Sequence, residues 1–186
     1  MAKVAILLAD GCEPVEALAP ADVLSRGGQD VSLVSINETT AVACAHGVNV
    51  VADDTLAAHD FSDCDLVVLP GGMPGTPHLR ANARVCELAR EFLAGRRLGA
   101  ICAAPSILAE LGLLEGRTAT CYPGCEGAFP AGVRPEALGV YTDGNLVTAS
   151  GPAYAIDFGL ALLRELAGEE VARRVADGML ESDRAR

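Results

Sequence analysis

The sequence contains no apolar run that approaches the length needed to cross a membrane, and it is short of positive charge. A membrane-spanning helix needs about 20 consecutive apolar residues. The 14 Lys and Arg are outnumbered by 25 Asp and Glu, which gives a formal net charge of −11. Phosphate backbones attract basic surfaces and repel a field of this sign. We therefore expect no membrane span and no tight binding of nucleic acid, whereas a small reactive substrate is compatible with the composition.

Motifs for structural metal or for a disulfide framework are also lacking. The seven cysteines are odd in number and lie in strand-like and helix-like segments rather than in loops. No Cys-x-x-Cys occurs, and Cys121 and Cys125 have no nearby histidine that would complete a zinc site. Reduced thiols of this kind are typical of a reducing compartment. Because residues 1–10 also lack the pattern of a signal peptide, we expect a cytoplasmic protein without bound metal.

Apolar, strand-like segments alternate with segments that have helical spacing. The expected strands are 4–9, 31–36, 65–69, 98–101 and 118–121, with hairpins over 41–52 and 140–150. The expected helices are 14–26, 85–93, 106–114, 153–167 and 169–180. Continuous apolar strands separated by helices are typical of a parallel sheet that is covered on both faces. We predict one domain over residues 1–186, an α/β three-layer sandwich with a mostly parallel sheet.

Three stretches with small or polar residues directly follow expected strands. They are GCEPVE at 11–16, PGGMPG at 70–75 and CAAP at 102–105. Ligands bind to open parallel sheets at the carboxyl ends of the strands, where neighbouring loops diverge. We therefore expect these three stretches to meet at one site.

Cys102 stands where an expected strand turns sharply into a helix. Small neighbours permit a tight bend that projects the side chain into a cleft, as in the nucleophile elbow of α/β hydrolases. The first turn of the following helix offers unpaired N–H groups that favour a thiolate, and Pro105 suits that turn. The alternative, a buried structural cysteine, is a common fate of free thiols and stays open on this pattern alone.

Glu16 is the candidate partner of that thiol. A carboxyl among apolar neighbours just after the first strand should resist ionisation. When protonated, it could donate a hydrogen bond to the sulfur and transfer protons in general acid–base catalysis. Gly71 and Gly72 could offer backbone N–H groups to an oxyanion or could merely form a turn. The alternative for Glu16 is an ordinary first-turn glutamate favoured by the helix dipole, a description that fits Glu13 better.

Five segments in the same order resemble the ThiJ/PfpI superfamily, specifically the clade of the parkinsonism-associated protein deglycase. They are GCEPVEALAPADVL (11–24), VVLPGGMPG (67–75), AICAAP (100–105), TCYPG (120–124) and TASGPAYAIDFGLALL (148–163). The resemblance covers nearly the whole chain and implies the flavodoxin-like sandwich of that superfamily. It implies that Cys102 is the nucleophilic, oxidation-prone cysteine and that Glu16 is its protonated partner. Gly71, Gly72 and Ala103 would then line the oxyanion side.

The resemblance also implies an activity. Members of this clade are homodimers that convert methylglyoxal or glyoxal to hydroxy acids without a cofactor, repair early glycation adducts, or protect and chaperone in a redox-dependent way. We therefore expect a homodimeric, cofactor-independent glyoxalase or deglycase, classed as a lyase or hydrolase. The alternative is a redox-sensing stress protein or chaperone that acts through oxidation of Cys102. A cysteine peptidase or amidotransferase-like hydrolase is less favoured, because Ala103 rather than histidine follows the cysteine.

The chain departs from that clade around the expected substrate pocket. Tyr122 stands where many members have a histidine before the proline, and tyrosine is no near-neutral base, so Glu16 would transfer protons alone. His46 and Ser150 stand where some relatives have arginines that line an anion pocket, which leaves Arg26 as the matching basic residue. We therefore expect Tyr122, Arg26, His46 and Ser150 to line the pocket.

Overall fold

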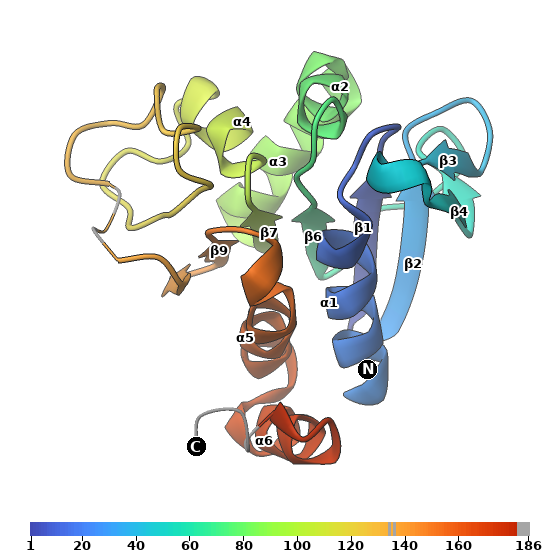
Figure 1. Cartoon of the computed structure of the whole chain (residues 1–186). Helices are drawn as coiled ribbons and strands as arrows, with labels where there is room; N and C mark the ends of the chain where they lie inside the picture. The colour runs from blue at the N-terminus through green and yellow to red at the C-terminus, as the bar shows by residue number, and fades with distance from the viewer. Residues whose placement is uncertain (134, 136, 182–186) are drawn as a thin grey trace.

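The protein, analysed as a computed structural model that describes residues 1–133, 135 and 137–181, is built on a seven-stranded sheet (Figure 1). The strands are β1 (Lys3–Leu8), β2 (Asp30–Ser35), β5 (Asp54–Thr55), β6 (Leu66–Leu69), β7 (Arg97–Ile101), β8 (Val140–Asp143) and β9 (Leu146–Ala149). Their spatial order is β5-β2-β1-β6-β7-β9-β8. All neighbours run parallel except β8, which pairs antiparallel with β9 at one edge. The mostly parallel α/β sandwich predicted from the sequence is confirmed.

Helices cover both faces of the sheet (Figure 1). One face carries α1 (Pro14–Arg26), α5 (Ala155–Ala167) and α6 (Glu169–Gly178), and the other carries α2 (Gly75–Ala81), α3 (Ala83–Gly95) and α4 (Pro105–Glu110). Side chains alternate between the two faces along a strand. In β1, Ile6 therefore packs under α1 and α5, whereas Leu7 packs under α3 and α4. This double burial explains why the central strands are apolar at almost every position.

One local prediction is confirmed, and two others need correction. The hairpin predicted over 41–52 is present as β3 (Ala41–Ala43) and β4 (Asn49–Val51), which pair antiparallel. The helix after Cys102 ends at Glu110 rather than at 114, because the chain turns at Gly112, whose φ is 71°. Residues 118–121 form no strand, since the Thr120 N–H bonds to the side chain of Thr148 instead of joining a ladder.

The loops after β1 and β6 press against each other at the carboxyl end of the sheet. The Glu13 N–H donates a hydrogen bond to the carbonyl of Gly71 over 3.0 Å. A Cβ on Gly72 would lie 2.3 Å from the backbone nitrogen of Glu13. Gly72 also has a φ of 96°, which glycine adopts without strain. The glycine pair therefore lets two backbones meet at the place where the sequence predicts a site.

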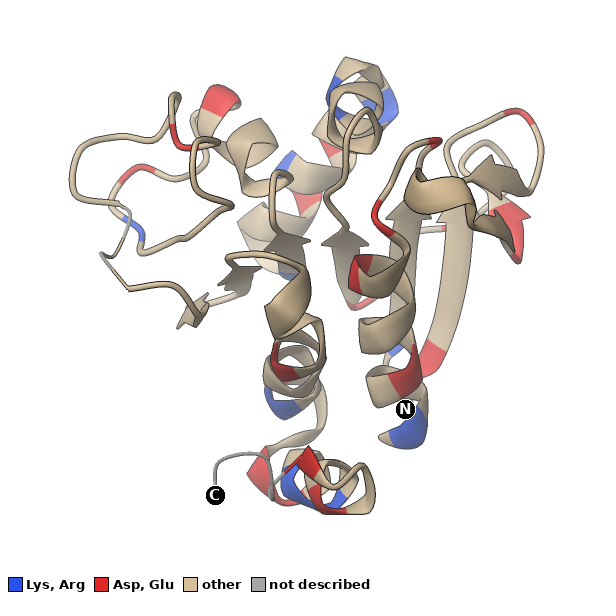
Figure 2. Cartoon of the chain, viewed as in Figure 1, with Lys and Arg blue, Asp and Glu red and all other residues tan. Residues whose placement is uncertain are grey.

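Charged side chains are spread over the surface. Figure 2 shows Lys and Arg on separate helices and loops, with acidic residues among them. Several of them form ion pairs, such as Arg173 with Asp177 over 2.8 Å, and such exposed pairs contribute at most about 1 kcal/mol each. None of the helices in the described part of the chain is long and apolar enough to cross a membrane.

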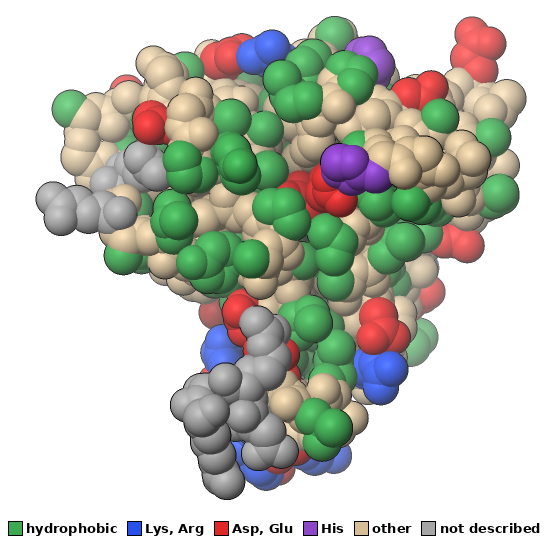
Figure 3. Space-filling view, viewed as in Figure 1, with side chains coloured by type: hydrophobic (Ala, Val, Ile, Leu, Met, Phe, Trp, Pro, Cys, Tyr) green, Lys and Arg blue, Asp and Glu red, His purple; other side chains and the backbone are tan. Residues whose placement is uncertain are grey.

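Apolar side chains are exposed on the face that carries α1 (Figure 3). Val15 and Leu18 on α1 are 42% and 38% exposed, and Val51 on β4 is 76% exposed. Single exposed apolar side chains are common, but a group of them on one face is typical of a surface that meets another molecule.

Candidate active site

Cys102 occupies a sharp bend between β7 and α4. Its φ is 62°, in the left-handed region that residues other than glycine rarely adopt. Its N–H donates to the carbonyl of Ala149 over 2.9 Å, and its carbonyl accepts from the N–H of Tyr122 over 2.8 Å. The residue is 9% exposed. The bend expected from the small residues around Cys102 is present, and neighbouring backbone holds it on both sides.

Glu16 projects from the first turn of α1 and is fully buried. Its Oε2 accepts a hydrogen bond from the N–H of Gly71 over 2.9 Å. Its Oε1 is buried and has no hydrogen-bond partner among the described residues. The side chain lies beside Cys102, since an added Cβ on Gly71 would be 2.7 Å from both Oε2 of Glu16 and the Cβ of the cysteine. Burial raises the pKa of Glu16 to about 7, although the contacts with Cys102 and Gly71 lower it. The carboxyl therefore keeps its proton until near-neutral pH.

The ionisation of Glu16 affects the pKa of the neighbouring Cys102 thiol. Burial, and then the negative charge of an ionised Glu16, raise the pKa of the Cys102 thiol. The backbone N–H groups of Ala103 and Gly72 bond to the sulfur and lower that pKa, as the sequence suggests, but burial outweighs them. When Glu16 is protonated, its charge no longer opposes the thiolate and its O–H can donate to the sulfur. The site therefore favours one negative charge shared by the two groups over two separate charges.

The three predicted oxyanion residues all lie beside the sulfur but differ in what their N–H groups do. Gly72 and Ala103 direct theirs to Cys102, whereas the N–H of Gly71 is taken by Glu16. A Cβ on Gly71 would lie 2.7 Å from the Cβ of Cys102. Gly71 is therefore corrected from an oxyanion donor to a residue that positions the carboxyl.

Tyr122 and His46 lie close to this pair in different ways. Tyr122 is tied to Cys102 through its backbone N–H, and its side chain is about half exposed. His46 lies on the turn between β3 and β4, and its Nε2 is 2.9 Å from Oε2 of Glu13. It thus contacts the loop that leads into α1 rather than Glu16 itself.

Ser150 is held by structural hydrogen bonds. It is buried directly after β9, and its Oγ accepts a hydrogen bond from the N–H of Gly139 over 3.0 Å. The same oxygen lies 2.9 Å from the hydroxyl of Thr120. These contacts tie two irregular segments to the sheet and leave the hydroxyl engaged with protein rather than with a ligand.

Arg26 is not brought together with the other predicted site residues. It lies at the last turn of α1, ten residues after Glu16, which places the two about 15 Å apart along the axis. Its Nε bonds to Asp22 over 2.7 Å, and the residue lines a separate cavity with Arg174 of α6. Figure 2 shows the basic end of α1 opposite its acidic start. Within the single chain, Arg26 therefore does not share a pocket with Cys102 and Glu16.

A cavity of about 390 Å³ adjoins the bend and contains residues that the sequence analysis did not identify. Its lining includes Ala103, Thr76 and Arg80, with Arg80 paired to Glu110. The hydroxyl oxygen of Thr76 is buried and has no hydrogen-bond partner among the described residues. Thr76 and Arg80 belong to the short helix α2, which lies in a Gly- and Pro-rich stretch with no helical signal.

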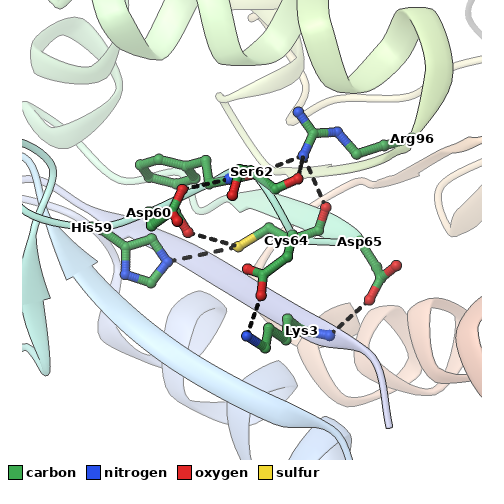
Figure 4. Close-up of polar contacts among 9 residues, drawn as sticks. Lys3, His59, Asp60, Ser62, Cys64, Asp65 and Arg96 are labelled. Carbon is green, nitrogen blue, oxygen red and sulfur yellow. Dashed lines mark hydrogen bonds and ion pairs between the residues drawn. The ribbon is translucent and has the colours of Figure 1, made fainter.

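A cysteine–histidine contact does occur, but not at Cys102. Figure 4 shows the side chains of His59 and Cys64 side by side, with Nε2 and Sγ 3.7 Å apart. Nδ1 of His59 lies 3.4 Å from a carboxylate oxygen of Asp54. Cys64 lies two residues before the start of β6, at the end of the sheet opposite Cys102. The three histidines of the described chain contact Glu13, Cys64 and the carbonyl of Asp10 rather than Cys102. None of them is therefore placed to act as the base of a cysteine peptidase at that sulfur.

The described part of the chain offers no group of three or more His, Cys, Asp or Glu side chains that could hold a metal ion. Among the residues that the structure describes, the carboxyl of Glu16 and the backbone N–H groups of Gly72 and Ala103 act on the Cys102 sulfur. This arrangement suits a developing oxyanion and a transferring proton.

Comparisons with known proteins show the family and the fold of the chain. A model of the DJ-1/PfpI family matches residues 2–165. The chain is similar to protein dj-1beta of Drosophila melanogaster, with 37% identity over 94% of this chain and 95% of that protein. It is 33% identical to the Parkinson disease protein 7 homolog of Danio rerio, over 96% of both chains. The solved structure of oxidized Toxoplasma gondii DJ-1 superposes with a TM-score of 0.92 at 35% identity, covering 97% of this chain and 98% of that one. The resemblance seen in the sequence is confirmed, and the chain belongs to the DJ-1/PfpI family.

Proposed function

We propose that the protein is a cofactor-independent glyoxalase or deglycase that acts on α-oxoaldehydes, or on early glycation adducts, through Cys102. The observation that supports this most directly is the contact between the Cys102 thiol and the fully buried Glu16. Burial keeps that carboxyl protonated to about pH 7, so it can give a proton to a substrate oxygen at physiological pH.

The reaction of methylglyoxal would begin with addition of the sulfur to the aldehyde carbon. The C–S bond forms, and the carbonyl oxygen takes the proton of Glu16 while the N–H groups of Gly72 and Ala103 stabilise its charge. The Glu16 carboxylate then removes the proton from the carbon bonded to sulfur and returns it to the neighbouring carbon, while the hydroxyl proton passes to the oxygen of that neighbouring carbon. The product is a thioester, and water releases lactate and restores the thiol.

These steps need no external oxidant or reductant. The aldehyde carbon is oxidised to the level of an acid while the neighbouring ketone is reduced to an alcohol. Glyoxal would yield glycolate in the same way. A single group that both gives and takes protons is enough, which is consistent with a site where Tyr122 stands in place of a histidine.

The test is lactate formation from methylglyoxal by the wild type and by Cys102→Ser, Glu16→Gln and Cys64→Ser. We expect Cys102→Ser to lose the activity and Glu16→Gln to lose a factor of about 10²–10⁴. Cys64→Ser is the matched control, because it removes a buried thiol at the other end of the sheet. Full turnover by Cys102→Ser would overturn the proposal.

A second candidate function is redox sensing by the same sulfur. The similar structure from T. gondii is of an oxidized protein. In this chain the unpaired Oε1 of Glu16 beside Cys102 is suited to hydrogen-bond an oxygen of a sulfinate. Mass spectrometry after mild peroxide treatment separates the two: selective addition of two oxygens at Cys102, with negligible turnover of methylglyoxal, favours the sensor or chaperone.

The homodimer implied by the family resemblance belongs to the same proposal. The exposed apolar side chains of Val15, Leu18 and Val51 provide a surface on which a second copy could pack. Light scattering should then give twice the mass of the chain. The cytoplasmic location stays a prediction.

A further inference from the structure

Two cysteines that the proposed chemistry does not use lie in direct contact. The S–H of Cys12 donates to the sulfur of Cys44, and the two sulfur atoms are 3.4 Å apart. Cys12 lies in the loop after β1, and Cys44 directly follows β3, so 32 positions of sequence separate them. Cys12 is fully buried, whereas Cys44 is 8% exposed.

The backbone holds these two segments together independently of the thiols. The N–H of Gly11 donates to the carbonyl of Ala43 over 2.8 Å, and the N–H of Ala45 donates to the carbonyl of Cys12 over 2.8 Å. Hydrogen bonds on both sides of the pair keep the segments at about the spacing of neighbouring strands, roughly 5 Å. Disulfides span Cα separations of about 4.4–6.8 Å, so the sulfurs can bond without moving the backbone.

We propose that Cys12 and Cys44 form a dithiol site that peroxides oxidise to an intramolecular disulfide. This inference does not rest on the proposed function, because neither Cys102 nor Glu16 takes part in it. The site lies within the subunit, and its reagent class is a small peroxide such as hydrogen peroxide.

The chemistry balances in two steps. The sulfur of Cys44, the more exposed of the two and the acceptor of the Cys12 S–H, attacks the O–O bond of the peroxide. The sulfur gains a hydroxyl as a sulfenic acid, and the other oxygen leaves as water with the thiol proton. The sulfur of Cys12 then attacks the sulfenic sulfur, the S–O bond breaks, and a second water leaves. Two thiols are oxidised, and one peroxide is reduced to two waters.

Burial sets the speed of this oxidation. It raises the pKa of Cys12 to about 12 and also raises the pKa of Cys44, near which Asp10 and Glu13 add further negative charge. The hydrogen bond from Cys12 acts in the opposite direction on Cys44. Because the thiolate is the reactive form, we expect disulfide formation to be slow at neutral pH and faster as the pH rises.

The pair also touches the loops that hold the candidate active site. A Cβ on Gly75 would lie 2.5 Å from the backbone nitrogen of Cys12, and a Cβ on Gly72 would lie 2.7 Å from its carbonyl carbon. Gly72 is the residue whose N–H bonds to Cys102. A disulfide would therefore tie the β3–β4 hairpin to the backbone that supports the reactive sulfur.

The experiment uses the Cys102→Ser chain, so that oxidation at Cys102 and the outcome of the proposed function have no influence. The protein is treated with hydrogen peroxide, alkylated under denaturing conditions and digested without reductant. We expect a cross-linked peptide pair that carries Cys12 and Cys44, two hydrogens lighter than the two thiol peptides and released by dithiothreitol. The melting temperature should rise by roughly 5–10 °C on oxidation and return on reduction.

Two matched variants complete the test. Adding Cys44→Ser should abolish both the cross-link and the rise in melting temperature, whereas adding Cys64→Ser should leave both unchanged. Recovery of Cys12 and Cys44 as alkylated thiols after prolonged peroxide treatment at alkaline pH, where more of the thiol is ionised, would overturn the proposal. A cross-link from Cys12 to any other cysteine would overturn it as well. If the added Cys44→Ser or Cys64→Ser substitution prevents folding, the measurement on the Cys102→Ser chain is decisive by itself.

Discussion

Gly71 lies so close to Cys102 that a Cβ on the glycine would be 2.7 Å from the Cβ of the cysteine. The same added atom would be 2.7 Å from Oε2 of Glu16 and 3.0 Å from the backbone nitrogen of Ala103. Both distances are shorter than ordinary van der Waals contact. The space in which the carboxyl meets the sulfur therefore exists because residue 71 has no side chain.

Gly71→Ala should disrupt the site while the sheet remains intact. The added methyl group must displace either Glu16 or the bend at Cys102, and a misplacement of about 1 Å can lower a rate about 10²-fold. Lactate formation from methylglyoxal measures the effect. Gly95→Ala is the control, because a Cβ there meets nothing within 4 Å. Equal turnover of the two variants would contradict the geometry described for the site.

Glu16→Gln should change how stability depends on pH. The folded chain keeps the Glu16 proton to about pH 7, whereas the ordinary pKa of the group is 4.5. The folded state therefore binds more protons between these values, and its stability falls as the pH rises through the window. We expect the wild type to lose about 3 kcal/mol relative to Glu16→Gln between pH 4.5 and 7, and little more above that. Urea unfolding across this range measures the difference, and parallel curves for the two proteins would show that the pKa is not raised.

Tyr122→Phe should leave the turnover of methylglyoxal within about threefold of the wild type. The backbone N–H of residue 122 holds the carbonyl of Cys102, and this substitution does not alter it. The side chain is about half exposed, and such surface changes have small effects. Steady-state kinetics give the answer. A loss of tenfold or more would assign the hydroxyl a part in proton transfer.

Arg26→Ala should not change the KM for methylglyoxal or for an anionic α-oxoacid such as glyoxylate. The guanidinium lies at the far end of α1 from Glu16 and pairs with Asp22. Loss of that exposed pair should lower stability by less than about 1 kcal/mol. A raised KM for the anionic substrate alone would show that Arg26 reaches the pocket after all.

The sheet and the bend could be predicted because their signals are local. β1, β6 and β7 are apolar at nearly every position, as strands covered on both faces must be. The small residues that follow Cys102 predict the tight turn. Helix α2 was not predicted, because it is short and lies among glycine and proline residues. Residues 118–121 have a strand-like composition, but side chains and distant carbonyls satisfy their backbone groups.

The residues that line the site were harder to predict from the sequence than its location in the fold. Glu16 was predictable as a partner of Cys102 because the segments that follow β1 and β7 both lie at the carboxyl end of one sheet. Arg26 was expected at the pocket from a likeness in residue type, but within the single chain ten residues of helix separate it from Glu16. The contact between Cys12 and Cys44 has no local signal, since it depends on the hairpin folding back over the loop after β1.

The left-handed backbone at Cys102 has a consequence for how this protein balances stability against chemistry. Glycine adopts a φ of 62° freely, whereas a residue with a Cβ is less stable there by about 1–2 kcal/mol. A glycine at position 102 would therefore make the folded state more stable but would remove the thiol. The protein keeps a thiol at a position where fold stability alone would favour its loss.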